Sequence, residues 1–231
     1  MRRRHDRRGS GTRDEGRFEG NPALDLEGLP RRARSIRGFR LHNRLACRFE
    51  TGVATLRSPM TQRGYRGQWI EVVTEDVDLP GGRRATLDTV RHPGAAAIVP
   101  FLDDDEVLLI RQYRHATGGE IFEIPAGKLD PGEDPQTCAA RELEEEAGQR
   151  AGRLHRLGAI WTAPGFTDEK IHLFSAHDLE AVPQRLEEDE VIELVPTPLA
   201  RALEMVWQGE LIDAKSAIAL VHAARNLGRL A

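Results

Sequence analysis

The sequence has little of what stabilises small secreted proteins or carries a chain through a membrane. Two cysteines, Cys47 and Cys138, are too few for a disulfide framework or a four-ligand zinc site, and no apolar secretory segment opens the chain. The longest apolar run, 94–102, contains a proline and is far shorter than the roughly 18 residues of a membrane span. We therefore expect a cytoplasmic protein that is not integral to a membrane.

The composition is that of a globular chain, but its charges are divided unevenly. Hydrophobic residues make up 39% of the 231 residues, and 22 glycines bring the apolar share close to the globular average. Residues 1–48 hold 14 arginines and six acidic residues, whereas the other 183 residues hold 19 basic and 31 acidic ones. The chain therefore consists of a basic arm and an acidic body.

The arm, taken as residues 1–59, shows neither strand alternation nor a helical stripe. Such a segment buries too little apolar surface to offset the entropy lost on ordering, so we interpret it as a disordered extension. Clustered arginines can bind nucleic acid. Because acidic residues are interspersed and no aromatic platform accompanies the arginines, that role is the weaker interpretation.

Strand signals begin at residue 69. Alternating residues at 69–78 and 85–90 flank the turn sequence Leu79-Pro80-Gly81-Gly82 and predict a hairpin. The segments 95–102 and 107–113 lie on either side of an acidic turn, and we predict that they pair with each other. Further strands are expected at 120–124, 157–161, 171–176 and 191–195.

Helix signals are fewer. Asp134 and Pro135 supply an N-cap and a first helical residue, and the helix should run to Ala147 with Gly148 as its stop. Two further helices are expected at 198–209 and 213–228. Strands and helices do not alternate, so the predicted class is α+β.

The stretch 126–149 carries the chemistry. On the predicted helix Glu142, Glu145 and Glu146 stand at i, i+3 and i+4, so three carboxylates project from one face. Like charges this close destabilise a helix unless one is protonated or a cation lies between them. Mg²⁺ binds a few carboxylates and keeps its other positions for water and substrate phosphates. A glutamate run can equally be a solvated helix face, and the surrounding pattern decides between the two interpretations.

Seven positions within 22 residues follow the spacing G-x5-E-x7-R-E-U-x-E-E-x-G, with a bulky aliphatic residue at U. This pattern resembles the Nudix box, the signature of hydrolases that act on a nucleoside diphosphate linked to another group. Gln149 departs from the family, which usually has an aliphatic residue there. The seven residues are Gly127, Glu133, Arg141, Glu142, Glu145, Glu146 and Gly148.

The resemblance implies a fold and a cofactor. The fold is a Nudix α/β/α sandwich with a mixed sheet at 94–231, preceded by a small antiparallel β region at 60–93. The cofactor is Mg²⁺, with Mn²⁺ possible, and bound cations would neutralise the phosphate oxygens and lower the pKa of the attacking water. Arg141 would orient the acids and contribute to catalysis, with Glu133 in support. The implied metal ligands are Glu142, Glu145, Glu146 and the backbone carbonyl of Ala126.

Segments on either side of the stretch 126–149 narrow the choice of substrate. The segment 163–169 is similar to the proline-containing loop of ADP-ribose pyrophosphatases, and the segments 111–114, 120–125 and 213–216 also resemble that subfamily. The resemblance implies that Arg114 holds a phosphate and Glu123 a ribose or metal-bound water. Glu169, on a mobile loop, would be the general base or a metal contact. The full set of implied substrate contacts is Arg111, Arg114, Glu123, Trp69, Pro164 and Phe166.

The subfamily also implies a homodimer in which the strands of residues 60–93 pair across subunits and an aromatic residue stacks on adenine. Trp69 is the candidate, because a nucleobase needs a flat apolar partner in an anionic site. Packing of Trp69 inside the hairpin is an equally simple interpretation. The eight histidines show no metal-ligand spacing, and we interpret each as structural or solvent-facing, with Cys138 as a small core residue.

The sequence therefore predicts an Mg²⁺-dependent hydrolase that cleaves ADP-ribose to AMP and ribose 5-phosphate. The alternative within the same class is a hydrolase of another nucleoside diphosphate sugar, such as a GDP-sugar. A non-catalytic nucleotide-sensing module with a nucleic-acid-binding arm is less favoured, because such modules often lose box acids and this chain retains them all.

Overall fold

The computed structural model describes residues 63–188 and 190–230, so the predicted extension at 1–59 lies outside the described residues. No helix within these ranges is long and apolar enough to cross a membrane. In chain order the elements are β1 (Arg63–Arg66), β2 (Glu71–Leu79), β3 (Arg83–Arg91), β4 (Ala95–Pro100), β5 (Glu106–Arg114), the 3-10 helix η1 (His115–Thr117), β6 (Gly119–Glu123), β7 (Ala126–Lys128), α1 (Pro135–Ala147), β8 (Gln149–Trp161), β9 (Lys170–Ala181), β10 (Ile192–Pro198), α2 (Leu199–Gln208) and α3 (Ala214–Asn226).

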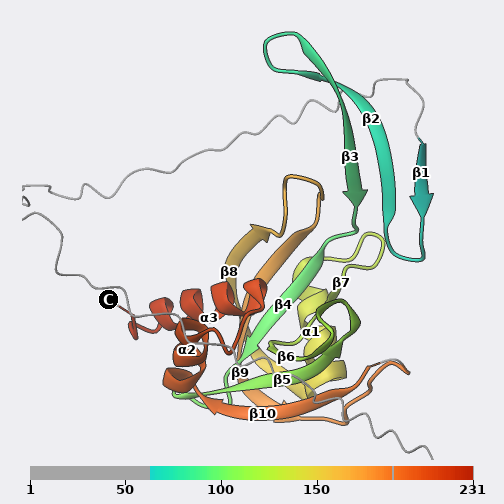
Figure 1. The fold of residues 1–231 in the computed structure, drawn as a ribbon. Helices are drawn as coiled ribbons and strands as arrows, with labels where there is room; N and C mark the ends of the chain where they lie inside the picture. Colours follow the sequence, from blue (N-terminus) through green and yellow to red (C-terminus); the bar gives the residue numbers. More distant parts are fainter. Residues whose placement is uncertain (1–62, 189, 231) are drawn as a thin grey trace, which may run out of the picture. The chain divides into compact units, whose positions relative to one another are not determined.

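An antiparallel sheet of order β1-β2-β3 precedes the rest of the fold (Figure 1). The predicted hairpin is confirmed as β2 and β3, which pair from Glu71↔Arg91 to Leu79↔Arg83. Gly81 and Gly82, in the turn 80–82, both have positive φ, 84° and 78°, which glycine adopts without steric cost. Strand β1 carries no clear period in the sequence and was not predicted.

Two further sheets form the body, with orders β7-β4-β9-β8 and β10-β5-β6. Strand β4 runs parallel to β9 and antiparallel to β7, which makes the larger sheet mixed. The predicted pairing of 95–102 with 107–113 is wrong, because only an isolated bridge between Phe101 and Val107 joins β4 to β5. Backbone N–H groups of Asp105 and Glu106 donate to the Asp103 carboxylate, and this turn passes the chain from one sheet to the other.

Strand β4 shows why the larger sheet lies between helices (Figure 1). Ala97 and Val99 belong to the buried cluster that contains residues of α2 and α3, whereas Ile98 belongs to the cluster that contains Cys138 and Leu143 of α1. Successive residues of a strand point to opposite faces, so each face is covered by helix. The protein is thus an α+β fold with a mixed sheet in an α/β/α sandwich.

Helix α1 begins and ends as predicted. The Asp134 carboxylate accepts a hydrogen bond from Gln136 N–H, and Gly148 adopts the left-handed conformation at φ 60°, donating its N–H to the last turn. Cys138 and Leu143 are fully buried against the sheet, which confirms Cys138 as a core residue. The acids of α1 therefore have a fixed register toward the neighbouring loop and β7.

Candidate active site

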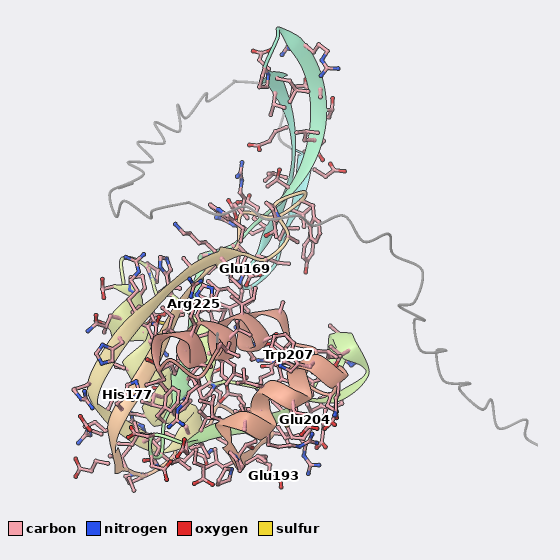
Figure 2. The ribbon with its side chains drawn as sticks, turned by 90° about the vertical axis from the view of Figure 1, so that its left-hand side faces the viewer. Glu169, His177, Glu193, Glu204, Trp207 and Arg225 are labelled. Atoms are coloured by element: carbon pink, nitrogen blue, oxygen red, sulfur yellow. The ribbon has the colours of Figure 1, made fainter. Side chains whose placement is uncertain are left out.

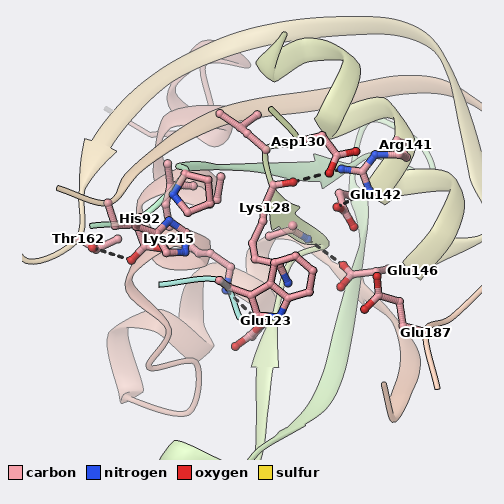
Figure 3. Close-up of a pocket in the computed structure, with 18 of the residues that line it drawn as sticks. His92, Glu123, Lys128, Asp130, Arg141, Glu142, Glu146, Thr162, Glu187 and Lys215 are labelled. Carbon is pink, nitrogen blue, oxygen red and sulfur yellow. Dashed lines mark hydrogen bonds and ion pairs between the residues drawn. The ribbon is translucent and has the colours of Figure 1, made fainter. Parts of the chain in front are cut away.

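A cavity of about 1060 Å³ opens beside β7 and the acidic part of α1 (Figure 3). Small-molecule sites typically reach this size. Four of its lining residues are lysines or arginines, and eight are acidic, so an anionic substrate would meet a net negative wall. The acidic residues are Glu123, Asp130, Glu142, Glu146, Glu169, Glu187, Glu190 and Asp213.

Two box acids are buried at this wall. Glu142 is 8% exposed and Glu146 is 2% exposed, and Glu146 accepts a hydrogen bond of 2.8 Å from Ala126 N–H. Burial, with a smaller contribution from nearby carboxylates, raises the pKa of Glu146 to about 8 despite that bond. Burial also raises the pKa of Glu142 to about 7, although Arg141 opposes the shift. Both groups are costly to ionise without a cation.

The backbone of β7 passes directly over Glu142. A Cβ atom added to Gly127 would lie 1.8 Å from Oε1 of Glu142, which is far inside van der Waals contact. Any larger residue at position 127 would overlap the Glu142 carboxylate. This steric limit explains why the first position of the box is glycine. Gly148, the last position, has positive φ and ends α1.

Arg141 organises the remaining acids. Its Nε and Nη2 donate to the two oxygens of Glu133, at 3.1 Å each, in a bidentate pair. Its Nη1 lies between Glu142 Oε1 at 2.7 Å and Glu145 Oε2 at 2.9 Å. The guanidinium therefore neutralises charge between two helix acids, where the sequence predicts a metal ion.

Within the described ranges, no group of three or more acidic, histidine or cysteine side chains is arranged to hold a metal ion. Glu145 does not line the cavity and instead pairs with Arg141. A divalent ion still fits the donor set, because Mg²⁺ is commonly held by one or two carboxylates together with substrate phosphates. Glu142 and Glu146 supply two such carboxylates, and because burial is the main cause of their raised pKa values, a cation would stabilise their ionised forms.

Another part of the cavity wall is a buried ion network. Arg114 donates to both oxygens of Glu123, at 3.1 and 2.7 Å. Lys215 Nζ lies 3.1 Å from Glu123 and 3.0 Å from Asp213, whose carboxylate also caps α3 by accepting from Ser216 N–H. The cap thus fixes the first turn of α3 and aims Lys215 toward the cavity (Figure 3).

Trp69 lies in the connection between β1 and β2 and lines the same cavity. Its ring is 56% exposed and Lys128 Nζ lies 4.6 Å from the ring centroid. This exposure excludes packing of Trp69 inside the hairpin. A cation–π contact of this kind stabilises the ring orientation at the cavity mouth.

Glu169 also lines the cavity, just before β9 at the end of the β8 and β9 hairpin (Figure 2). Its Oε2 accepts from Thr162 Oγ1 at 2.8 Å, and its Oε1 lies 3.6 Å from His92 Nε2. The backbone of this loop is bonded to β3, since Val90 N–H donates to the carbonyl of Phe166. The loop is therefore fastened at both the backbone and the side chain.

Some predicted contacts lie outside the cavity. Arg111 pairs with Glu120 and Glu193 on the surface of the β10-β5-β6 sheet, and Phe166 is 60% exposed. Pro164 and Glu133 do not line the cavity either, and Glu133 acts on it through Arg141. Direct substrate contacts of Arg111, Pro164 and Phe166 stay predictions.

The structure adds lining residues that sequence reasoning missed. They come from strand ends, from the segment between β9 and β10 and from the first turn of α3, and only the fold brings them to the box. Two signals were available: the acidic run at 187–190 gathers carboxylates next to a predicted strand, and the segment 213–216, which contains Lys215, resembles the subfamily. The added residues are His92, Lys128, Thr162, Glu187, Glu190 and Lys215.

Comparison with known proteins agrees with this geometry. The family model described as NUDIX domain matches residues 91–215. An ADP-ribose pyrophosphatase of Bacillus subtilis (strain 168) is 40% identical over 160 residues, which are 68% of this chain and 86% of that protein. A GDP-mannose pyrophosphatase of Cronobacter sakazakii (strain ATCC BAA-894) is 35% identical over 161 residues, which are 66% of this chain and 83% of that protein.

A solved structure described as an ADP compounds hydrolase has the same fold, with a TM-score of 0.63 and 26% identity, covering 75% of this chain and all of that one. The matched segment 91–215 contains all seven box positions and the residues of the cavity other than Gln68 and Trp69. The chain therefore belongs to the Nudix family and is a Nudix hydrolase.

Proposed function

We propose that this protein is an Mg²⁺-dependent pyrophosphohydrolase that cleaves ADP-ribose to AMP and ribose 5-phosphate. The observation that carries the proposal is the acidic cavity wall, in which Glu142 and Glu146 are buried with raised pKa values. A pyrophosphate is anionic, so a site that binds it through such a wall needs cations between them. The relative named ADP-ribose pyrophosphatase, at 40% identity, supports this choice of substrate.

Glu142 and Glu146 would hold the metal, together with the backbone carbonyl of Ala126. Glu145 would take part only when Arg141 releases it, because their side chains are hydrogen-bonded at 2.9 Å. A bound divalent ion supplies charge neutralisation at the phosphate oxygens and lowers the pKa of an attacking water. Mn²⁺ has compatible ligand preferences and could replace Mg²⁺.

The chain's own cations would orient the substrate. Arg114 and Lys215 both line the cavity and carry positive charge beside Glu123. Either side chain can therefore contact a substrate phosphate bound in the cavity. Trp69 presents an exposed ring at the mouth and would stack on the adenine. These contacts would hold the pyrophosphate between the cationic residues and α1.

Two carboxylates are candidates for activating water. Glu169 is expected from the sequence to be the general base or a metal contact, and its carboxylate lines the cavity and accepts a hydrogen bond from Thr162. Glu190 lies near the helix acids, since its charge adds to the effect of burial in raising the pKa of Glu142 and Glu146. Replacing each with glutamine discriminates between them, because loss of a general base reduces kcat by about 10²–10⁴-fold.

A GDP-sugar is the alternative substrate, supported by the relative named GDP-mannose pyrophosphatase at 35% identity. The same carboxylates would serve, and only the base and sugar contacts would differ. We also propose a homodimer formed through residues 60–93, with residues 1–59 outside the catalytic unit and 94–231 as the hydrolase domain.

The test is an assay of the purified full-length protein with Mg²⁺ against a panel of nucleoside diphosphate compounds, with products identified by mass. The proposal predicts the highest kcat/KM for ADP-ribose, with AMP and ribose 5-phosphate as products. A preference for a GDP-sugar would select the alternative. Hydrolysis of no member of the panel would contradict a pyrophosphohydrolase function.

A further inference from the structure

His92 lies between β3 and β4 with both ring nitrogens facing defined partners. Its side chain is 14% exposed and lines the cavity. Nδ1 accepts a hydrogen bond of 3.1 Å from Gly94 N–H. A neutral imidazole carries one proton, so an accepting Nδ1 leaves the proton on Nε2. The backbone of Gly94 thus selects the tautomer that donates from Nε2.

The group in front of Nε2 is the Glu169 carboxylate. Its Oε1 lies 3.6 Å from His92 Nε2, and Thr162 Oγ1 donates to its Oε2 at 2.8 Å. The first separation is longer than a hydrogen bond, and contacts of this kind in a site without substrate often shorten when substrate binds. One donor thus faces each oxygen of Glu169, and both oxygens keep lone pairs for the cavity.

The imidazole and the carboxylate are also joined through the backbone. His92 N–H donates to Asp168 Oδ1 at 2.8 Å, and Asp168 Oδ2 accepts from Arg91 Nη1 at 3.0 Å. Asp168 N–H donates to the carbonyl of Val90 at 3.2 Å. The end of β3 and the loop at 162–169 are therefore held together, so the position of His92 relative to Glu169 is fixed by these contacts of Val90, Arg91 and Asp168.

We propose that His92 is a positioning residue that orients the Glu169 carboxylate toward the substrate by donating Nε2–H to Oε1. The inference rests on the proposed function, because Glu169 meets substrate only if this cavity is the active site. His92 contributes to turnover through Glu169 alone. Its replacement therefore has no further effect once Glu169 has been removed.

Two variants with side-chain amides distinguish the roles of the two ring nitrogens of His92. The side-chain amide of His92→Gln reaches the position of Nε2 and can donate to Glu169, whereas that of His92→Asn reaches only the position of Nδ1. We expect His92→Asn to lower kcat/KM about 10- to 100-fold, as misplacement of a reacting group does. The division between kcat and KM should match that of Glu169→Gln. His92→Gln should restore most of the activity.

A double-mutant cycle in the full-length protein completes the test. In the Glu169→Gln background, His92→Asn should change kcat/KM by less than about twofold, because coupled residues are not additive. An equal loss in both backgrounds would overturn the proposal, as would a His92→Gln variant no more active than His92→Asn. If His92→Asn does not fold, the activity of a folded His92→Gln variant tests the proposal instead. Near-normal activity of that variant supports the proposal, and a large loss contradicts it.

A second measurement does not depend on activity. Two-bond ¹H–¹⁵N correlation spectra of the wild-type protein at pH 8.5, with His92 assigned by its absence in His92→Gln, report which ring nitrogen is protonated. We predict protonated Nε2, and a change of its ¹⁵N shift in Glu169→Gln. A protonated Nδ1 would refute the assignment. A wild-type protein that shows this tautomer but hydrolyses no substrate would contradict the proposed function and leave the contact in place.

Discussion

At the scale of single residues, the site depends on how closely the backbone approaches one carboxylate. The oxygens of Glu142 occupy the space that a side chain at Gly127 would need. The atom in the way is the end of a flexible side chain and not backbone, so a larger residue at 127 can be accommodated by moving Glu142. Such a change would spare the fold and displace a proposed metal ligand.

We therefore predict that Gly127→Ala folds with a loss of stability no greater than about 1–3 kcal/mol, the range for overpacking, but loses hydrolysis by more than about tenfold. Gly119→Ala is the matched control, because its Cβ would meet no atom within 4 Å. Thermal denaturation and steady-state kinetics of both variants measure the two effects. Full activity in Gly127→Ala would show that the position of Glu142 is not critical.

The two buried acids predict a link between pH, metal and stability. The folded-state pKa values of about 8 for Glu146 and about 7 for Glu142 lie above the ordinary value near 4.3. The folded protein then binds these protons more tightly than the unfolded chain. The stability they contribute is complete at low pH and is lost as pH rises from about 4 through 8.

A cation should offset that loss. Mg²⁺ at about 100 times its Kd would add about 2.7 kcal/mol, or roughly 5–10 °C in Tm for a domain of this size. We predict a larger difference in Tm between Mg²⁺ and EDTA at pH 8.5 than at pH 5.5, and a much smaller one in Glu146→Gln. Equal differences in the wild-type protein and the variant would argue against metal binding at Glu146.

The sequence predicts correctly those site residues whose pattern lies within one short segment of the chain. Glu142 and Glu146 are four residues apart on one helix, and both line the cavity. The sequence did not indicate that Arg141 would hold Glu145 away from the cavity, because either a guanidinium or a metal ion can neutralise neighbouring carboxylates. His92, like the other histidines, was interpreted as structural or solvent-facing, because no residue near it in the sequence indicates that Glu169 will face it.

At the scale of elements, α1 was predictable to the residue, whereas the pairing of strands beyond the hairpin of β2 and β3 was not. Asp134 and Gly148 act on the helix that they flank, so their signals need no tertiary context. The partner of β4 depends on which strands lie beside it in space, and the residues of β9 that pair with it lie 76 positions further along the chain. The strand β7, which contains Gly127, is too short to show an alternation of apolar and polar residues that would predict it from the sequence.

The N-cap of α1 offers a test of this local argument. Asp134→Ala removes the acceptor for Gln136 N–H and should destabilise the protein by about 1 kcal/mol, which corresponds to a fall in Tm of about 2–4 °C. Asp134→Asn keeps an acceptor oxygen and should leave Tm nearly unchanged. Chemical denaturation measures the difference, and equal losses in both variants would mean that charge, and not the hydrogen bond, stabilises the helix.

At the scale of the whole molecule, we propose that the sheet of β1, β2 and β3 forms the dimer. Strand β1 is an edge strand of this sheet, with Tyr65 68% exposed, and edge strands are templates for pairing with another chain. The basic arm at 1–59 is not needed for the catalytic unit in this account. Among the described residues, those that line the acidic cavity all lie at 68–215.

Sedimentation equilibrium tests the dimer, and an activity assay of a shortened chain tests whether the basic arm is needed. The account predicts twice the 25.8 kDa of one chain for the full-length protein, and a dimer of unchanged specific activity when the chain begins at Met60. Tyr65→Glu should give monomers. Tyr113→Glu, at a site 50% exposed on β5, should remain dimeric. Monomeric wild-type protein, or an inactive shortened chain, would contradict this arrangement.

The most direct test of the central claim compares two glutamates of one helix. Glu146 is buried at the cavity, whereas Glu144 pairs with Arg150 and does not line it. With ADP-ribose and Mg²⁺, we predict that Glu146→Gln lowers kcat/KM by at least about 10²-fold and that Glu144→Gln stays close to the wild-type value, with both variants folded. Near-normal hydrolysis by Glu146→Gln would contradict the account of this site.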